Sequence, residues 1–445
     1  MRRVVVMGGS FAGLMAARVL SDHADEVVIL EQDEISENGL GPGAPHRAQL
    51  HALLAMGHMQ LERWFPGIVK ELIADGAQLG TGTAIQFYVD NILKVPVPDT
   101  EMIGATRPFI EAHLRSRVAA LPNVELRTAQ ARDLIISGDQ VRGVRFSSAS
   151  DGRHSATPDG ELAADLVVDA MGRSSRLSSW LEHHGWEQPP LHRLRVDLGY
   201  ATAFFQRGDE LPGTQMAQAT PGPASSYRPA ITEPGALTAV EGNRWSVVLA
   251  GYTDYRPSRD PEQFLTRMRR CVPPLQEVAN QCAMVDNEVK TYHFRESIKR
   301  DFASLGRLPR GLMAIGDALA SVNPIYGQGL TLATLQASCL SAHLQTGGRP
   351  QDSMWGYFRR ARAVVDAAWQ LSSTADLAQP HVTGPYPPGY RLLRWAGDKV
   401  MVASIFDPVV NQAFMDVLHM KAHPRTLTNP RLLKRAARAF AIPAA

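Results

Sequence analysis

Near the N-terminus, several glycines and one carboxylate follow each other at a spacing that suits a ligand with phosphate groups. The apolar run 4–7 leads into Gly8-x-Ser10-x-x-Gly13, and Glu31 lies 18 positions after Gly13. Gly8 permits a tight turn, Gly13 lets the next helix pack on the strand, and the small Ser10 lets backbone N–H groups approach a pyrophosphate. Glu31 would accept hydrogen bonds from ribose hydroxyls and would repel a 2′-phosphate. The pattern predicts a dinucleotide-binding strand–helix–strand unit, whose loop also contains Gly9, Phe11 and Ala12.

A second glycine-rich stretch lies far along the chain, where Gly316-Asp317 is followed by Pro324 and then by Gly327-Gln328-Gly329-Leu330. An aspartate at the end of a strand can hold a hydroxyl group of a polyol. The turn leads into an expected helix over 330–345, so its backbone N–H groups would stabilise negative charge on the ring of a reduced flavin. An ordinary strand–loop–helix connection is the alternative. Taken together, the two stretches favour FAD as the ligand.

Three motifs in this chain resemble those of a known enzyme family. The stretch 315–329 closely resembles the Gly-Asp motif of flavin-dependent monooxygenases of the para-hydroxybenzoate hydroxylase type. Asp169-Ala170-Met171-Gly172-Arg173 resembles their intermediate motif, and Arg107-Pro108 resembles the family arginine that contacts the flavin. The motifs occur in the family order over about residues 4–345. The resemblance implies FAD binding through these residues, Asp169, Gly172 and Arg107 included.

Within that family the chain looks most like the epoxidases of the monensin and lasalocid type and the squalene-type branch. The features that carry this likeness are the stretches 45–54, 200–202 and 323–327. The chain departs from those relatives at one position. They have an arginine three residues after the proline that corresponds to Pro45, where this chain has Ala48. Arg47 is one position earlier. Arg47 either takes over the flavin contact or is a solvated loop arginine.

The resemblance implies a monooxygenase in which NADPH or NADH, or a separate reductase, supplies electrons to FAD. One atom of O2 would enter a small hydrophobic molecule of secondary metabolism, such as an antibiotic precursor. Epoxidation of a polyketide or isoprenoid alkene is the first hypothesis, and aromatic hydroxylation is the second. A flavin reductase or dehydrogenase acting on isoprenoid carbon is the alternative from another enzyme class, and a non-catalytic flavin-binding protein is a third. A halogenase is less favoured, because Trp-x-Trp-x-Ile-Pro is absent.

No residue of the sequence stands out as catalytic, because transfer of oxygen from a flavin needs no protein nucleophile. Four residues on expected strands are candidates for contact with the substrate: Tyr200, Phe204, Tyr252 and His293. For each of them, a role in packing the sheet is the competing interpretation.

The composition excludes some classes of protein. The formal net charge of the 445 residues is +2, which gives no sign of nucleic-acid binding. Three cysteines without a Cys-x-x-Cys predict reduced thiols and no metal site. The glycines that interrupt the first apolar run argue against a signal peptide, and no apolar run is long enough to span a membrane. We therefore expect a cytoplasmic monomer or homodimer. Its basic segment 430–440 forms a helix that either packs on its own domain or contacts a membrane surface.

The apolar patterns predict an α/β protein: a Rossmann-like FAD-binding domain with an inserted antiparallel-sheet substrate domain and a helical C-terminal region. Strands are expected at 4–7, 27–31, 83–98, 124–128, 133–137, 141–147, 166–169, 196–206, 236–252 and 288–296, and helices at 11–21, 49–65, 108–120 and 330–345. The expected FAD-binding parts are 1–80, 105–185 and 299–345, the substrate-binding parts are 81–104 and 186–298, and the helical region is 346–445.

Overall fold

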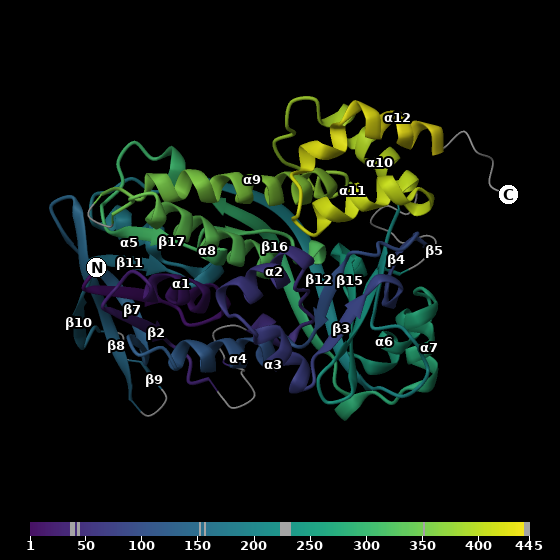
Figure 1. The fold of residues 1–445 in the computed structure, drawn as a ribbon, viewed down its shortest axis with the longest axis horizontal. Helices are drawn as coiled ribbons and strands as arrows, with labels where there is room; N and C mark the ends of the chain where they lie inside the picture. Colours follow the sequence, from purple (N-terminus) through teal and green to yellow (C-terminus); the bar gives the residue numbers. More distant parts are fainter. Residues whose placement is uncertain are drawn as a thin grey trace.

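The computed structural model describes residues 1–35, 41, 45–150, 153–154, 157–222, 233–349 and 352–439. It has two large sheets that lie side by side, with a group of C-terminal helices above the second sheet (Figure 1). The first sheet contains the N-terminal strands, and the second contains strands from the middle of the chain. This arrangement confirms the predicted fold class.

The centre of the first sheet is parallel, and its outer edge is an antiparallel hairpin. In spatial order its strands are β10 (Gly160–Ala163), β8 (Gln140–Ser150), β7 (Val124–Ser137), β2 (Glu26–Glu31), β1 (Arg3–Met7), β11 (Leu166–Asp169) and β17 (Leu312–Ala314), with β9 (Arg153–His154) paired to β8.

The parallel strands are short apolar runs because helices and strands cover them on both faces. Val4, Val5 and Val6 have no exposed surface, which is typical of a parallel strand in a covered sheet. Helices α1 and α8 pack against each other, and α8 also packs against α9. The helices of this part of the molecule are α1 (Phe11–Ser21), α2 (Ala55–Trp64), α3 (Ile68–Ala74), α4 (Arg107–Ala119), α5 (Leu177–His183), α8 (Gly329–Gln345) and α9 (Trp355–Asp376).

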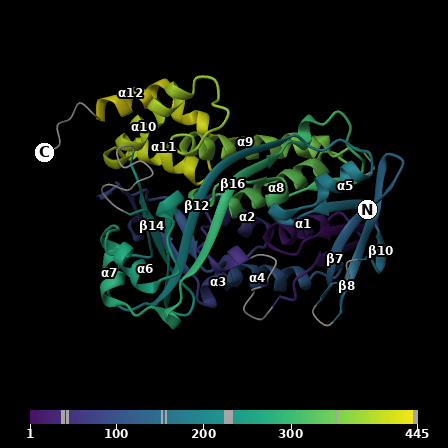
Figure 2. The same ribbon diagram turned by 180° about the vertical axis from the view of Figure 1, so that it is seen from behind.

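The second sheet is antiparallel except where β4 pairs with β13 in parallel. Its strands are β18 (Ala320–Ser321), β16 (Lys290–Arg300), β12 (Leu191–Gln206), β15 (Arg244–Tyr252), β14 (Gly235–Val240), β13 (Met216–Thr220), β4 (Ile85–Val89) and β5 (Ile92–Leu93). The long strands β12 and β16 of this sheet run side by side (Figure 2). Two helices pack against β15 and β14 of this sheet: α6 (Pro261–Met268) and α7 (Pro273–Gln281). A small separate sheet joins β3 (Gln78–Thr81) to β6 (Glu101–Gly104).

The C-terminal helices pack on one another and on the β4–β5 end of the second sheet (Figure 1). They are α10 (Tyr390–Phe406), α11 (Pro408–Leu418) and α12 (Pro430–Ala439). Leu432, Leu433 and Ala436 of α12 belong to a core cluster with residues of α10 and α11. Between the two interpretations of the basic helix, the structure therefore shows packing on its own chain. Among the described residues, no helix has the length and apolarity needed to cross a membrane.

Several expected elements differ from those observed. The expected helix 49–65 begins only at Ala55, because Leu53 forms a β-bridge with Ile103 and the backbone of Leu54 is extended. The strands 124–128 and 133–137 are one strand, β7, whose irregular register accommodates the polar residues between them. The single strand 236–252 is two strands joined by a turn at Gly242 and Asn243, which both have positive φ. β13 had no counterpart in the prediction. The proposed domain boundaries stay a prediction.

Candidate cofactor and substrate site

A cavity of about 1240 Å³ lies where both sheets and the C-terminal helices meet. Its walls include the loop after β1, the end of β2, the loop before α8, several strands of the second sheet, and residues of α9, α10 and α11. The two glycine-rich stretches of the sequence are therefore brought to one cavity, although about 300 residues separate them.

The loop between β1 and α1 requires glycine at two positions. Gly8 has a φ of +107°, and a Cβ atom on it would lie 2.4 Å from the carbonyl oxygen of Ala170. A Cβ atom on Gly13 would lie 1.9 Å from the carbonyl oxygen of Gly8. The close packing turns the N-terminus of α1 toward the cavity, where Gly8, Ser10, Phe11 and Ala12 form part of the wall. Gly9 and Gly13 are not part of the wall.

Glu31 lies at the end of β2, also in the cavity wall. One carboxylate oxygen accepts a hydrogen bond of 2.8 Å from the N–H of Gly9, and the other accepts one of 3.0 Å from the N–H of Asp33. Each oxygen retains the capacity to accept another hydrogen bond. This carboxylate is therefore held in place and fits the hydroxyl groups of a ribose.

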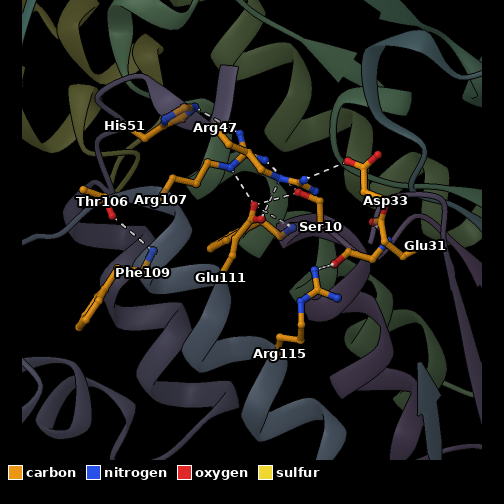
Figure 3. Close-up of polar contacts among 12 residues, drawn as sticks. Ser10, Glu31, Asp33, Arg47, His51, Thr106, Arg107, Phe109, Glu111 and Arg115 are labelled. Carbon is orange, nitrogen blue, oxygen red and sulfur yellow. Dashed lines mark hydrogen bonds and ion pairs between the residues drawn. The ribbon is translucent and has the colours of Figure 1, made fainter. Parts of the chain in front are cut away.

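Helix α4 presents three charged residues along one face, because Arg107, Glu111 and Arg115 are four residues apart. Thr106 caps the helix by accepting a hydrogen bond from the N–H of Phe109 (Figure 3). The three side chains point toward the loop after β1, where Arg115 donates to the carbonyl oxygen of Gly9 over 2.7 Å (Figure 3). The first two of them form the centre of an ion-pair network.

Glu111 joins two arginines that line the cavity. Its carboxylate lies 2.7 Å from Nε of Arg107 and 3.2 Å from Nε of Arg47 (Figure 3). It also accepts hydrogen bonds from the hydroxyl of Ser10 and the N–H of Phe11. Burial alone would raise the pKa of Glu111, but these two guanidinium groups and the hydrogen bonds hold the pKa below its usual value. Glu111 is therefore a buried anion among cations.

Arg47 is not a solvated loop arginine. Its side chain is only 2% exposed, and it forms a second ion pair of 3.3 Å with Asp33. The neighbouring Ala48 is not part of the cavity wall, whereas Arg47 is. The structure thus places a guanidinium group at the cavity one position earlier than the epoxidase pattern has it. Contact of this group with a flavin stays a prediction.

Two histidines beside Arg107 are neutral. Burial, with Arg107 as the next cause, lowers the pKa of His46 to about 2 and that of His51 to about 3. Nδ1 of His51 lies 2.9 Å from the carbonyl oxygen of Gln49, so we assign the proton to that nitrogen. Nε2 can then accept the hydrogen bond of 3.2 Å from Arg107. His51 thereby positions Arg107 in the wall.

The second glycine-rich stretch forms another part of the wall. Gly316 and Gly327 have φ values of +67° and +68°, which glycine adopts without strain. Asp317 accepts a hydrogen bond of 3.1 Å from Ser321, and burial raises the pKa of its carboxyl group. Pro324, Gly327, Gly329 and Leu330 line the cavity, and a Cβ atom on Gly329 would meet no other atom. The N-terminus of α8 therefore opens onto free space that can hold a ring system.

Three residues of the expected cofactor set lie close to the wall or at its edge. Gly172 belongs to the wall and has a φ of +74°. Asp169 lies behind it and accepts hydrogen bonds from the N–H of Met171 and the hydroxyl of Ser175, so it shapes this loop. Burial raises the pKa of Asp169 to about 6. Gln328 is also buried behind the wall, and none of the described residues forms a hydrogen bond with its side-chain oxygen.

Two of the four candidate substrate residues, Tyr200 and Tyr252, line the cavity. Phe204 and His293 do not. The ring of Phe204 lies under the guanidinium group of Arg244, 4.8 Å from it, at the far end of β12. His293 is 40% exposed and pairs with Asp197 over 2.7 Å, because its side chain points away from the cavity. The structure thus separates residues that the strand pattern placed together.

The sequence interpretation missed a buried polar cluster next to the second glycine-rich stretch. Asp376 of α9 accepts hydrogen bonds of 2.7 Å from Asn323 and 2.9 Å from the hydroxyl of Tyr326. Asn323 also donates to the hydroxyl of Tyr252 over 3.3 Å. Burial raises the pKa of Asp376 to about 7, and its second oxygen, Oδ2, is buried with no hydrogen-bond partner among the described residues. No sequence signal marks Asp376, since it lies within a long helix.

Lys94 was also missed. It follows β5 and is only 5% exposed, and its side chain belongs to the cavity wall. Burial lowers the pKa of its amine to about 7. Glu111 could have been found, because it lies one helical turn after Arg107 on the same predicted helix.

Comparisons with known proteins agree with this architecture. No family model matches the chain. Protein Rv3254 of Mycobacterium tuberculosis (strain ATCC 25618 / H37Rv) is 28% identical over 423 residues, which cover 92% of this chain and 88% of that protein. Among solved structures, the flavin-dependent brominase Bmp2 has a TM-score of 0.69 at 15% identity and covers 98% of both chains. The p-nitrophenol 4-monooxygenase PnpA from Pseudomonas putida DLL-E4 has a TM-score of 0.65 at 16% identity, over 97% of this chain and 99% of that one. These likenesses show that the chain has the fold of flavin-dependent monooxygenases and halogenases.

Proposed function

We propose that this protein is an FAD-dependent monooxygenase that uses O2 and NADPH or NADH to insert one oxygen atom into a hydrophobic small molecule. The main support is the continuity of the cavity. Its wall contains the phosphate-type loop at Gly8–Gly13 and the N-terminus of α8, and it continues between apolar residues of the second sheet and the C-terminal helices. A cofactor and an apolar substrate would thus share one continuous cavity.

The residues present fit FAD. Glu31 would accept hydrogen bonds from the ribose, and the N-terminus of α1 would lie against the diphosphate. Asp317 would hold the polyol chain, and the N-terminus of α8 would favour negative charge on the flavin ring. Arg47 and Arg107 supply fixed positive charge in the same wall. When bound, the flavin supplies the activation of O2 and the transfer of one oxygen atom.

The chain's own residues would orient the substrate and keep water out. Among the apolar residues of the wall are Leu198, Val248, Ile325, Met401 and Phe414. Such a chamber suits an alkene of a polyketide or isoprenoid, because epoxidation of an alkene requires no proton transfer from the substrate. Epoxidation is therefore the first candidate reaction.

Hydroxylation of an aromatic ring is the second candidate, and the Asp376 cluster favours it. Phenols react faster when a base removes the hydroxyl proton. Tyr252 and Tyr326 line the cavity, and Asp376 behind them titrates close to neutral pH. A substrate phenol could pass its proton to the hydroxyl oxygen of Tyr326 while Tyr326 passes its own proton to the carboxylate of Asp376.

The test uses FAD-loaded protein, NADPH and ¹⁸O2 with two probe substrates, geranylgeraniol and 2-naphthol. We expect one ¹⁸O atom in the product, detected by mass spectrometry. An epoxide from geranylgeraniol supports the first candidate, and a hydroxylated naphthol supports the second. Formation of the same product without O2 would instead indicate a reductase or dehydrogenase, and a protein that takes up no FAD would contradict every enzymatic hypothesis.

The variant Asp376→Asn separates the two reactions. It should lower hydroxylation of 2-naphthol by about 100-fold, because loss of a base typically costs that much or more. Epoxidation of geranylgeraniol should continue at the wild-type rate. Equal losses in both reactions would mean that Asp376 only maintains the wall.

A further inference from the structure

At Lys94 the cavity wall contains a buried amine among apolar side chains. Lys94 follows the β4–β5 hairpin, whose strands lie on the side of the second sheet and the C-terminal helices, away from β2 and α1 (Figure 1). Its N–H donates to the carbonyl oxygen of Phe87 over 2.8 Å. The next residue is fixed on both sides, because Val95 bonds to the carbonyl oxygen of Ile405 and accepts from Asn411. The backbone at Lys94 is thus firmly attached to α10 and α11.

The amine of Lys94 is surrounded by apolar groups. Nζ lies 4.2 Å from the ring centre of Phe414 and 3.7 Å from the sulfur of Met415. Phe87 and Leu418 belong to the same wall. Among the residues that the structure describes, no carboxylate forms an ion pair with Lys94. An ammonium group buried in this way costs free energy, and a ring face offsets only part of that cost.

A second buried nitrogen near Lys94 belongs to His419. Nδ1 of His419 accepts a hydrogen bond of 3.2 Å from the N–H of Ala55, so the ring proton is on Nε2. That Nε2 atom is buried, and no residue in the described part of the chain forms a hydrogen bond with it. Burial, with Lys421 and Lys94 as further causes, lowers the pKa of His419 to about 3, so the ring is neutral. The neutral ring of His419 carries no charge that could neutralise the Lys94 ammonium group. Its N–H can donate a hydrogen bond to an anion bound there.

We propose that the substrate of this cavity is an apolar molecule with one carboxylate, and that Lys94 binds this carboxylate. The inference rests on the proposed function and adds a substrate class to it. An anion is the partner that a buried amine without a counter-ion lacks, and a single amine suits a monoanion. The apolar walls suit the rest of the molecule. Binding at Lys94 would hold the substrate by its carboxylate end, so that the position of oxygen insertion depends on distance along the molecule.

Burial lowers the pKa of the Lys94 amine to about 7, which supports Lys94 as the group that binds a carboxylate. An amine that is partly neutral without ligand becomes fully charged when a carboxylate arrives, because the opposite charge favours the ammonium form. The ring face of Phe414 favours the charged amine by less than its burial costs, so a carboxylate would add the larger stabilisation.

The test measures binding of two probes by calorimetry to FAD-loaded protein, without NADPH. The probes are decanoate and decan-1-ol, which share a chain and differ in charge. We expect the wild-type protein to bind decanoate about 10-fold more tightly or better, in line with a charge-assisted hydrogen bond. Lys94→Met should abolish that preference and leave decan-1-ol binding within about 2-fold. The control Lys70→Met, at an exposed position of α3, should behave as wild type.

Equal affinity of the wild-type protein for decanoate and decan-1-ol would overturn the proposal, whether or not the variant folds. A preference that survives Lys94→Met would also overturn it. The outcome is independent of turnover. If ¹⁸O enters a probe but decanoate has no preference, the substrate class is wrong and the monooxygenase proposal stands. If decanoate is preferred but no oxygen is transferred to any probe, the substrate class stands and the monooxygenase proposal is wrong.

Discussion

Buried charges around the loop after β1 have partners, whereas those of Lys94 and Asp376 are left incompletely paired. Around the loop after β1, every buried carboxylate has a partner: Glu31 has backbone N–H groups, and Glu111 lies between two arginines. Near the C-terminal helices no described carboxylate pairs with Lys94, and behind the wall Oδ2 of Asp376 on α9 has no partner among the described residues. Paired charges stabilise the fold and preform the cofactor region. Unpaired charges cost free energy, so we infer that they serve ligands or protons.

The largest effect is expected from removal of a charge in the paired region. Glu111→Gln would leave the buried Arg47 and Arg107 uncompensated, and loss of one partner of a buried ion pair costs about 3–5 kcal/mol. Denaturant unfolding measures this loss of stability. The control is Glu71→Gln, which removes a surface partner of Arg117 and should cost less than about 1 kcal/mol. If both variants lost the same unfolding free energy, the buried ion pairs of Glu111 would contribute no more than a surface pair.

A pH-dependent effect is expected from Asp376. Its pKa is about 7 in the folded protein and 3.8 as an unperturbed group, so the folded state binds the extra proton. The resulting stability is fully present below about pH 4 and is lost as the pH rises through 7. Asp376→Asn cannot titrate. The unfolding free energy of the wild type should therefore fall by about 2–4 kcal/mol relative to the variant between pH 4 and 8. A constant difference across this range would show that Asp376 titrates normally.

FAD binding tests the paired region directly. Glu31→Ala should weaken FAD binding by about 10- to 100-fold, because a charged acceptor is lost, and should leave the spectrum of bound flavin unchanged. Asp317→Ala should lose FAD during purification, since it removes the expected partner of the polyol. The exposed Glu34→Ala is the control. Full flavin occupancy in Asp317→Ala, or a shifted spectrum in Glu31→Ala, would contradict these assignments.

The smallest effect has the opposite sign. Lys94→Met removes a buried charge that has no counter-ion, so the ligand-free protein should gain about 1 kcal/mol of stability. Thermal unfolding at pH 6, where the amine is charged, gives the clearest measurement. Lys70→Met should change stability by less than about 0.5 kcal/mol. A loss of stability in Lys94→Met would mean that its contact with Phe414 outweighs the cost of burial.

Much of the first sheet could be predicted, because its signals are local. An apolar run, a glycine turn and an amphipathic helix determine β1, α1 and β2, and the observed bounds differ from the expected ones by one residue at most. The second sheet was less predictable. β13 is short, and its pairing with β4 joins residues more than 120 positions apart. No local pattern carries that information.

The sequence by itself determined the residue types that fit a dinucleotide and a flavin, since these depend on backbone freedom at Gly8, Gly13 and Gly316 and on the carboxylates Glu31 and Asp317. Only the tertiary structure decided which other residues share the cavity. Asp376 and Lys94 line or support it, whereas His293 points away. The physical reason is that the burial and the partners of a side chain depend on elements distant in the chain. Those two properties decide whether a charge is compensated or left for a ligand.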